Sequence, residues 1–491
     1  MLLGIFHCYR LDESNGWNHR LGWLKLSQVC QRWRHLIYGC AFHLGIYIEF
    51  PNLNGTRAVD VLEQLPPLPL FINYRQPRHT TLGILTEQEE LGIYNALQLH
   101  DRVCHIDLEL PPSVLRRVFV LPDEEFPILE HLSISFGTPT ENHRSLTLPN
   151  AFQASFRAPN LRYLTLPSIC PLRDLQLLTS TVFLVTLVLS HIRPSSYFHP
   201  RLLVTRLQSL PQLEELSIGF STLIPPPGAE RGLLLGGQRA PVTLPSLKIL
   251  QFKGVSAYLE SLVSQIRVPR LKRLLITLFN QIAFALPHLS NLINITKAFK
   301  LPSANVFFGH NEVYITTVHY RGSWHQLEKG PFLLRVMCDQ LNWKVNYAAQ
   351  ICHALKFALS GVEELTLYLY RDQDLWDNWI RTELRNGAID SAAWHDLLMS
   401  FVSLKELRIY YYALLEELSR ALQVDEVGFD PGFLPNLRSI TAADNRFKLF
   451  INSRRLMGHP VEFSRWRFLP QQRDYGGLDS DSSSVQTPSS H

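Results

Sequence analysis

Histidine and cysteine are the residues of this chain whose chemistry could support catalysis or metal binding. The sequence holds 19 histidines and seven cysteines, the latter at positions 8, 30, 40, 104, 170, 338 and 352. The histidines are dispersed, and none stands at metal-ligand spacing from a cysteine or a carboxylate. The cysteines are odd in number, scattered and without a CxxC pair, which argues against a disulfide framework and for a reducing compartment. We therefore expect no bound metal and no cofactor.

Sequence motifs that position a nucleophile or a phosphate are also missing. The chain has no GxxxxGK[ST], no GxGxxG after an expected strand, no HExxH and no GxSxG. His100 and His105 flank the start of an expected strand, where a structural hydrogen bond is the more frequent role. The glycine-rich run 232–237 follows the prolines 225–227 and lacks the lysine of a phosphate-binding loop. We predict that the chain is not an enzyme, and an unrecognised enzyme is the third of three hypotheses.

Composition and charge describe a folded chain without a strong electrostatic preference. The 491 residues are 46% hydrophobic and 18% charged, which suits a globular protein better than a disordered one. The net charge of +4, from 47 basic and 43 acidic residues, is too balanced to indicate nucleic acid as the main partner. No run reaches the ~18 apolar residues that a membrane helix needs, and the N-terminus makes a poor signal peptide. We expect an intracellular protein, in the cytoplasm, the nucleus or both, without membrane contact.

A leucine-rich unit recurs from about residue 100 and organises most of the chain. A proline or small residue precedes LxxLxL or a close variant in segments 126–136, 158–166, 210–218, 244–252, 268–276, 361–370, 401–411 and 434–442. Helical patterns lie between the copies. One strand and one helix per ~20–35 residues is typical of a leucine-rich-repeat solenoid, whose units close their core by stacking. The alternative is a conventional parallel α/β sheet that matches by chance. Residues 277–360 hold no clean copy, although 312–320 and 332–338 look like strands, and we expect the array to continue there.

The strand period of two predicts which side chains of each unit face the core. We expect burial in one stacked parallel sheet for Leu132, Leu164, Leu187, Leu216, Leu250 and Leu274, continued by Leu365, Leu407 and Ile440. In the early units the intervening side chains are small or polar, namely Ser133, Ser135, Thr165, Ser217, Gln251 and Lys253.

Aromatic and basic side chains replace them in the late units. The same alternation turns Thr366, Tyr368, Tyr370, Arg408, Tyr410 and Tyr412 outward. Tyrosine and arginine are enriched at binding hot spots, so Tyr368, Tyr370, Arg408, Tyr410 and Tyr412 are candidate substrate-binding residues. Two alternatives remain open: the tail or a loop covers this patch, or the tyrosines are ordinary strand formers.

The first 48 residues follow a helical pattern. One apolar stripe, at i, i+3, i+4, i+7, i+10 and i+11, comprises Leu26, Val29, Cys30, Trp33, Leu36 and Ile37. A further short amphipathic helix is predicted ahead of it, with Leu2, Leu3, Ile5 and Phe6. Helices this short must bury an apolar face against the remaining chain or against a partner.

The segment LSQVCQRWRHLI (26–37) resembles the second half of an F-box. An F-box helix followed by leucine-rich units is similar to the F-box/leucine-rich-repeat proteins, and more narrowly to the large family of them in mushroom-forming fungi. Segments 99–108, 247–281 and 456–466 carry that closer match. The resemblance implies a non-catalytic substrate receptor of a cullin-RING (SCF-type) ubiquitin ligase. Its F-box would bind a Skp-type adaptor through the ten apolar residues of the two helices, and its repeats would hold an unknown substrate protein.

One departure concerns the opening of the F-box, which in the family is a Leu-Pro-x-[DE] turn. Here residues 1–6 begin inside the first helix. Either the gene prediction starts too late, or the F-box is degenerate and the chain is a leucine-rich-repeat scaffold without ligase recruitment.

The predicted organisation is α/β with a small all-α N-terminal part. Residues 1–48 are the F-box-like helices, and 49–100 are a linking segment with a first strand and helix. Residues 101–469 form an irregular solenoid of parallel strands and helices, and the serine-rich tail 470–491 is disordered.

Overall fold

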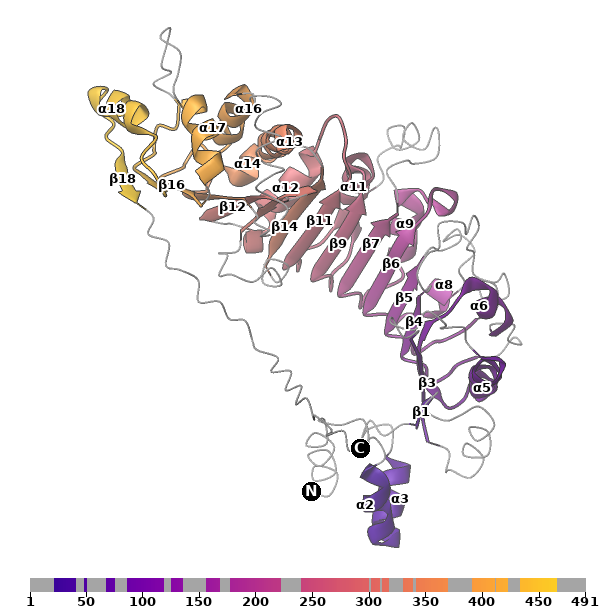
Figure 1. Ribbon diagram of the computed structural model, residues 1–491. Coiled ribbons are helices and arrows are strands. Elements are labelled where there is room, and N and C mark those ends of the chain that lie inside the picture. Colours follow the sequence, from indigo (N-terminus) through magenta and orange to yellow (C-terminus); the bar gives the residue numbers. More distant parts are fainter. Residues whose placement is uncertain are drawn as a thin grey trace, which may run out of the picture.

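The fold is α/β, built around a single long sheet. The computed structural model describes residues 22–40, 48–50, 68–75, 86–118, 125–135, 156–167, 177–221, 240–299, 302–309, 311–317, 330–338, 341–369, 391–410, 412–422 and 433–465. Within them, 16 strands form a curved sheet whose inner side is open and whose outer side carries the helices (Figure 1).

The sheet strands, in sheet order, are β1 (Ile48–Phe50), β2 (Leu70–Tyr74), β3 (Val103–Glu109), β4 (His131–Ser135), β5 (Tyr163–Pro167), β6 (Thr186–Ile192), β7 (Glu215–Phe220), β9 (Ile249–Gly254), β11 (Arg273–Leu278), β14 (Phe332–Met337), β13 (Glu312–Thr316), β12 (Ser303–Phe308), β15 (Glu364–Leu369), β16 (Glu406–Ile409), β17 (Ser439–Ala442) and β18 (Glu462–Arg465). A separate pair is formed by β8 (Val242–Thr243) and β10 (Ile266–Arg267). The segment expected to link the N-terminal helices to the array thus contributes β1 and β2 to the same sheet.

The helices are α2 (Gly22–Val29), α3 (Gln31–Gly39), α5 (Glu87–Gln98), α6 (Pro112–Val118), α8 (Leu177–Ser180), α9 (Pro200–Leu207), α11 (Ser256–Val263), α12 (Pro287–Ile295), α13 (Leu341–Ala354), α14 (Lys356–Leu359), α16 (Ser391–Met399), α17 (Tyr412–Leu422) and α18 (Lys448–Leu456). Short 3-10 turns cover Pro194–Ser196 and Lys297–Phe299. None of the helices in the described ranges combines the length and the apolarity needed to cross a bilayer.

The leucines of the repeated units that face the helices form one continuous buried row, as predicted. Leu132, Leu164, Leu187, Leu216, Leu250 and Leu274 pair in register across β4, β5, β6, β7, β9 and β11. All six are fully buried. Leu365, Leu407 and Ile440 continue the pattern in β15, β16 and β17. The row forms because alternate side chains of each strand point to the helices, so stacked units share one core.

The stretch 277–360 stays in the same sheet, as expected, but the order of its strands is reversed. β13 runs antiparallel to both β12 and β14, while β14 pairs in parallel with β11 and β12 with β15. Three residues, 309–311, join β12 to β13. A connection this short permits only an antiparallel pair, because a parallel one needs a crossover of about a dozen residues. A three-stranded meander is therefore inserted between two parallel blocks.

Aromatic side chains fill the core beneath β6 to β9. The ring of Tyr258 on α11 lies 4.8 Å from that of Phe220 and 5.7 Å from that of Tyr197, between ring centroids. Tyr258 is fully buried, and its hydroxyl has no hydrogen-bond partner in the described part of the chain. Burial accordingly raises the pKa of the Tyr258 phenol well above its ordinary value.

We expect Tyr258→Phe to raise the free energy of unfolding by about 1 kcal/mol, because it removes a buried hydroxyl that lacks a partner. Urea denaturation of both proteins measures the change. Tyr347→Phe is the matched control, since the Tyr347 hydroxyl donates to Asn280 Oδ1 at 2.5 Å. The control should lose about 1 kcal/mol. A loss of stability in both variants would contradict the prediction.

Candidate binding surfaces

A row of stacked aromatic rings crosses the inner face of the sheet at its C-terminal half. The ring centroids of Phe307 and Tyr368 lie 4.4 Å apart with planes 6° from parallel, and those of Tyr368 and Tyr410 lie 4.6 Å apart at 13°. The spacing follows from register, because neighbouring strands lie ~4.8 Å apart and Phe307 pairs with Tyr368. Tyr368 and Tyr410, predicted to share one patch, are both half-buried and in contact.

Two arginines border these rings, each compensated by carboxylates. Arg408 donates to both carboxylate oxygens of Glu406, at 2.7 and 2.9 Å, and lies 3.6 Å from Glu364. The hydrogen bond to Glu406 raises the pKa of Arg408 further above its ordinary value. Arg335 stands 4.8 Å from the ring centroid of Tyr314 on β13. We call Arg335, Tyr368, Arg408 and Tyr410 the aromatic patch; Phe307 and Tyr314, only 1% and 7% exposed, are buried next to it.

Two of the residues predicted to face outward differ from the prediction, and a third is untested. Thr366 faces the same side but is only 4% exposed. Tyr370 lies outside the described residues. Tyr412 begins α17 instead of extending β16, so its prediction as an outward strand residue is wrong. The helix prevails because its buried side chains recur with helical spacing, at Leu414, Leu415, Leu418 and Leu422.

Phe307, Tyr314 and Arg335 were not predicted as binding residues. They belong to β12, β13 and β14, which carry no leucine-rich unit, and β13 and β14 were expected only as strands. The run NVFF in β12 signals a strand, but the side that Phe307 faces follows from the reversed strand order.

A second aromatic row lies on the same face at the N-terminal half. The rings of Phe71, His105 and His131 stack with centroids 3.7 and 3.9 Å apart, and Tyr163 follows at 5.7 Å. Burial, reinforced by the neighbouring His131, lowers the pKa of His105 to about 3, and burial also lowers the pKa of His131. Both imidazoles are therefore neutral at physiological pH, and the row is an uncharged stacked surface. His100, off this row, makes the expected structural hydrogen bond through Nδ1 to the Glu125 carbonyl, at 2.9 Å.

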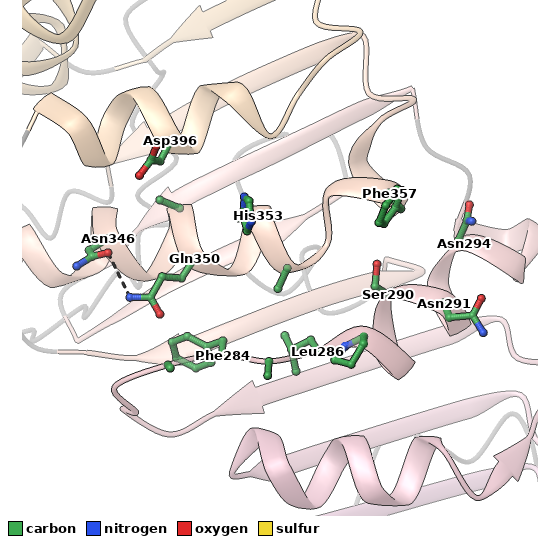
Figure 2. A pocket seen from close by; sticks show the side chains of 15 residues that line it. Phe284, Leu286, Ser290, Asn291, Asn294, Asn346, Gln350, His353, Phe357 and Asp396 are labelled. Carbon is green, nitrogen blue, oxygen red and sulfur yellow. Dashed lines mark hydrogen bonds between the residues drawn. The ribbon is translucent and has the colours of Figure 1, made fainter.

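The helices of the outer face border a cleft of about 850 Å³ (Figure 2). α12 contributes Ser290, Asn291 and Asn294 to its lining, and α13 contributes Asn346, Gln350 and His353. Phe284, Phe357 and Asp396 also line the cleft. No sequence pattern predicts this cleft, because its amides come from segments that carry no recurrent motif.

The first turn of α12 is held by a carboxylate from the preceding helix. Glu260 on α11 accepts hydrogen bonds from the backbone N–H groups of His288 and Leu289, at 2.8 and 2.9 Å. Burial nevertheless raises the pKa of Glu260, against the effect of these two hydrogen bonds. The carboxylate thus caps α12 while carrying a desolvation cost.

We expect Glu260→Ala to lower the free energy of unfolding by about 1–2 kcal/mol, because two buried N–H groups lose their acceptor. Glu260→Gln is the matched variant and should lose about half as much as the Ala variant at pH 7, because its single amide oxygen can accept from only one of the two N–H groups. Since the folded-state pKa is raised, wild-type stability falls as pH rises from about 4.5 through that pKa. The stability difference between wild type and the Gln variant should therefore grow towards pH 4 in denaturation measured across pH, and a difference that shrank on acidification would contradict this account.

At the N-terminal end, the predicted single apolar stripe is divided between two helices. Cys30 lies between α2 and α3 and is the N-cap residue of α3. Its backbone is extended, with φ −160° and ψ 165°. Its sulfur accepts from the Trp33 backbone N–H at 3.4 Å. Arg34 and Tyr38 of α3 reach back to Ser27, at 3.0 and 3.4 Å. The prediction of one continuous helical face is wrong, because the chain turns at Cys30.

The ten predicted adaptor-binding residues are placed unequally. Val29 is 60% exposed and Cys30 is exposed, whereas Leu26, Trp33 and Leu36 are half-buried. Ile37 is fully buried and belongs to the core. Leu2, Leu3, Ile5 and Phe6 lie outside the described residues.

Among the described residues, no group of three or more His, Cys, Asp or Glu side chains could hold a metal ion. A comparison with protein-family models finds no match, and a comparison with curated proteins finds none either.

Proposed function

We propose that this protein is a substrate-receptor subunit of a cullin-RING (SCF-type) ubiquitin ligase. In this proposal the N-terminal helices bind a Skp-type adaptor, and a leucine-rich-repeat solenoid made of the sheet and its helices holds the substrate protein. The observation that carries the proposal is the coupling of the F-box-like segment 26–37 to a stacked array of strand and helix units with leucines in one row. The receptor would act in the cytoplasm, the nucleus or both, without a catalytic residue of its own.

The helix pair has the properties of a docking element. It is too short to bury its own apolar side chains, and it leaves Val29 exposed with Trp33 half-buried. Apolar side chains at the surface of a small element favour burial in a partner, and a central tryptophan is a frequent hot spot. Ile37, being fully buried, would act by holding α3 in place.

The aromatic patch is the best candidate for substrate contact. It lies on the inner face, where no described helix packs (Figure 1). Its rings are held by stacking, so little side-chain freedom is lost when a partner binds. Because Arg408 is balanced by Glu406 and Glu364, the patch would favour an apolar or weakly basic segment over an acidic one.

Capture of Skp-type adaptor and cullin by the full chain tests ligase recruitment. Recovery of both supports the proposal. If an N-terminally extended form that restores the Leu-Pro turn is folded and still ignores the adaptor, the ligase proposal fails. The second candidate, a leucine-rich-repeat scaffold with a degenerate F-box, would then stand, and the burial of Ile37 with the half-burial of Trp33 is the observation that favours it.

We expect the double substitution Tyr368→Ala, Tyr410→Ala to weaken capture of substrate proteins about tenfold, or 1.4 kcal/mol. Quantitative mass spectrometry of proteins captured from cells with blocked degradation measures the change. The control is Lys253→Ala, an exposed residue on the same face that belongs to neither aromatic row. Identical partner sets for the patch variant and wild type, with adaptor binding intact, would move the substrate site elsewhere.

A further inference from the structure

The cleft on the outer face exists because the inserted meander adds strands without adding helices. Among the described residues, a helix separates most consecutive strands of the parallel blocks, as α11 does between β9 and β11. Between α12 and α13 the chain adds β12, β13 and β14, with no α-helix among the described residues. Each strand widens the sheet by ~4.8 Å, whereas packed helices lie ~8–10 Å apart. The sheet is therefore wider at this point than the helices that cover it, and α12 and α13 are separated.

Primary amides line both walls of this cleft. Asn291 and Asn294 belong to α12, and Asn346 and Gln350 belong to α13 (Figure 2). Gln350 donates to Asn346 Oδ1 at 3.2 Å, which orients the two amides along the wall. A primary amide offers both donors and an acceptor, so it can pair with the N–H and the C=O of a peptide backbone.

The rise along α13 from Asn346 to Gln350 is close to the two-residue repeat of an extended chain. Asn346 and Gln350 are four residues apart, a rise of ~6.0 Å along the helix. In an extended peptide the backbone groups on one side recur every second residue, at ~6.6 Å. The two amides are joined at 3.2 Å, so they present the remaining donors and acceptors of one pair to a strand-like segment that runs along α13.

Ser290 provides an independent sign that the cleft takes a polar ligand. Its side chain lines the cleft, the residue is 5% exposed, and its hydroxyl has no hydrogen-bond partner in the described part of the chain. A buried hydroxyl without a partner is costly, and a ligand group in the cleft would satisfy it.

Charge and apolar surface define the side chains of the ligand. Asp396 is the carboxylate of the lining, so a basic side chain is favoured beside it. Phe357, at the α14 end of the cleft, is 78% exposed and offers an aromatic contact. We propose that the cleft between α12 and α13 binds an extended peptide segment of a partner protein, with a basic side chain beside Asp396 and an apolar one against Phe357. The site lies on the face opposite the aromatic patch and does not depend on ligase recruitment.

Selection of random dodecapeptides on the full chain tests this inference. The enriched peptides should carry Lys or Arg, and their affinity is measured by fluorescence polarisation. Asn346→Ala with Gln350→Ala should weaken binding at least tenfold. The matched control is Gln88→Ala with Asn95→Ala, the same two residue types on α5 at the other end of the array, which should leave binding unchanged. Asp396→Asn should weaken the enriched peptides but not versions whose basic residue is alanine.

Thermal unfolding of each variant shows whether it still folds. If the double variant at Asn346 and Gln350 does not fold, Asp396→Asn still tests the proposal, because Asp396 is exposed. The proposal is overturned if no peptide is enriched on wild type. It is also overturned if Asp396→Asn does not distinguish basic from neutral peptides, or if a neutral oligosaccharide such as maltohexaose displaces the bound peptide. Failure of adaptor capture would leave this result untouched, so the two proposals fail separately.

Discussion

Replacing Leu250 with alanine should lower the free energy of unfolding by about 2–5 kcal/mol. Leu250 is fully buried and pairs in register with Leu216 on one side and Leu274 on the other. Its truncation opens a cavity in the middle of the row, where neighbouring strands hold the backbone and prevent collapse. Guanidinium denaturation of the full chain, followed by circular dichroism, measures the loss.

Lys253→Ala, in the same strand, is the control for this substitution. Lys253 is exposed on the inner face, so its truncation should change stability by no more than about 0.5 kcal/mol. Equal losses for the two variants would mean that the row of buried leucines does not form a shared core. A loss below about 1 kcal/mol for Leu250→Ala would lead to the same conclusion.

Trp33→Ala should weaken binding of a Skp-type adaptor by about 2 kcal/mol or more, which is the loss typical of a hot-spot residue. Trp33, in α3, is half-buried and packs against the hydrophobic core. Trp33 is not fully buried, and Val29 on the preceding helix is 60% exposed. Isothermal titration of the adaptor into each full-length protein gives the difference.

Two controls separate docking from folding in this experiment. Trp343→Ala removes another half-exposed tryptophan, 48% exposed on α13, and should leave adaptor affinity unchanged. Denaturation of Trp33→Ala shows whether the substitution also unfolds the helix pair. If stability and affinity fall together, Trp33 serves the core, and the docking role assigned to it is wrong.

Sequence patterns predicted the repetitive half of this architecture correctly. Each LxxLxL unit places its leucines two apart on a strand, and the shared offset after the proline or small residue fixes where each strand begins. Leu132, Leu164, Leu187 and Leu216 therefore pair in register although loops of different lengths separate them. Period and register are local properties, so a single sequence reveals them.

Side-chain contacts between units were predictable where two strands carry the same unit. Tyr368 and Tyr410 each stand at the third outward position of a unit, so parallel pairing of β15 and β16 brings them together. Tyr412 fails this rule because the amphipathic pattern of α17 begins there and outweighs the strand period.

The sequence alone thus determined the strand and helix units, the buried leucine row and the pairing of two tyrosines, because each depends on a periodicity of a few residues. Tertiary structure decided three other features. The turn at Cys30 divides the N-terminal stripe, and the contacts of Arg34 and Tyr38 with Ser27 join the two helices. The meander of β12, β13 and β14 reverses strand order, which brings Phe307 against Tyr368 and separates α12 from α13. Strand order depends on which distant segments pair, and that choice is a balance of long-range contacts that no local pattern records.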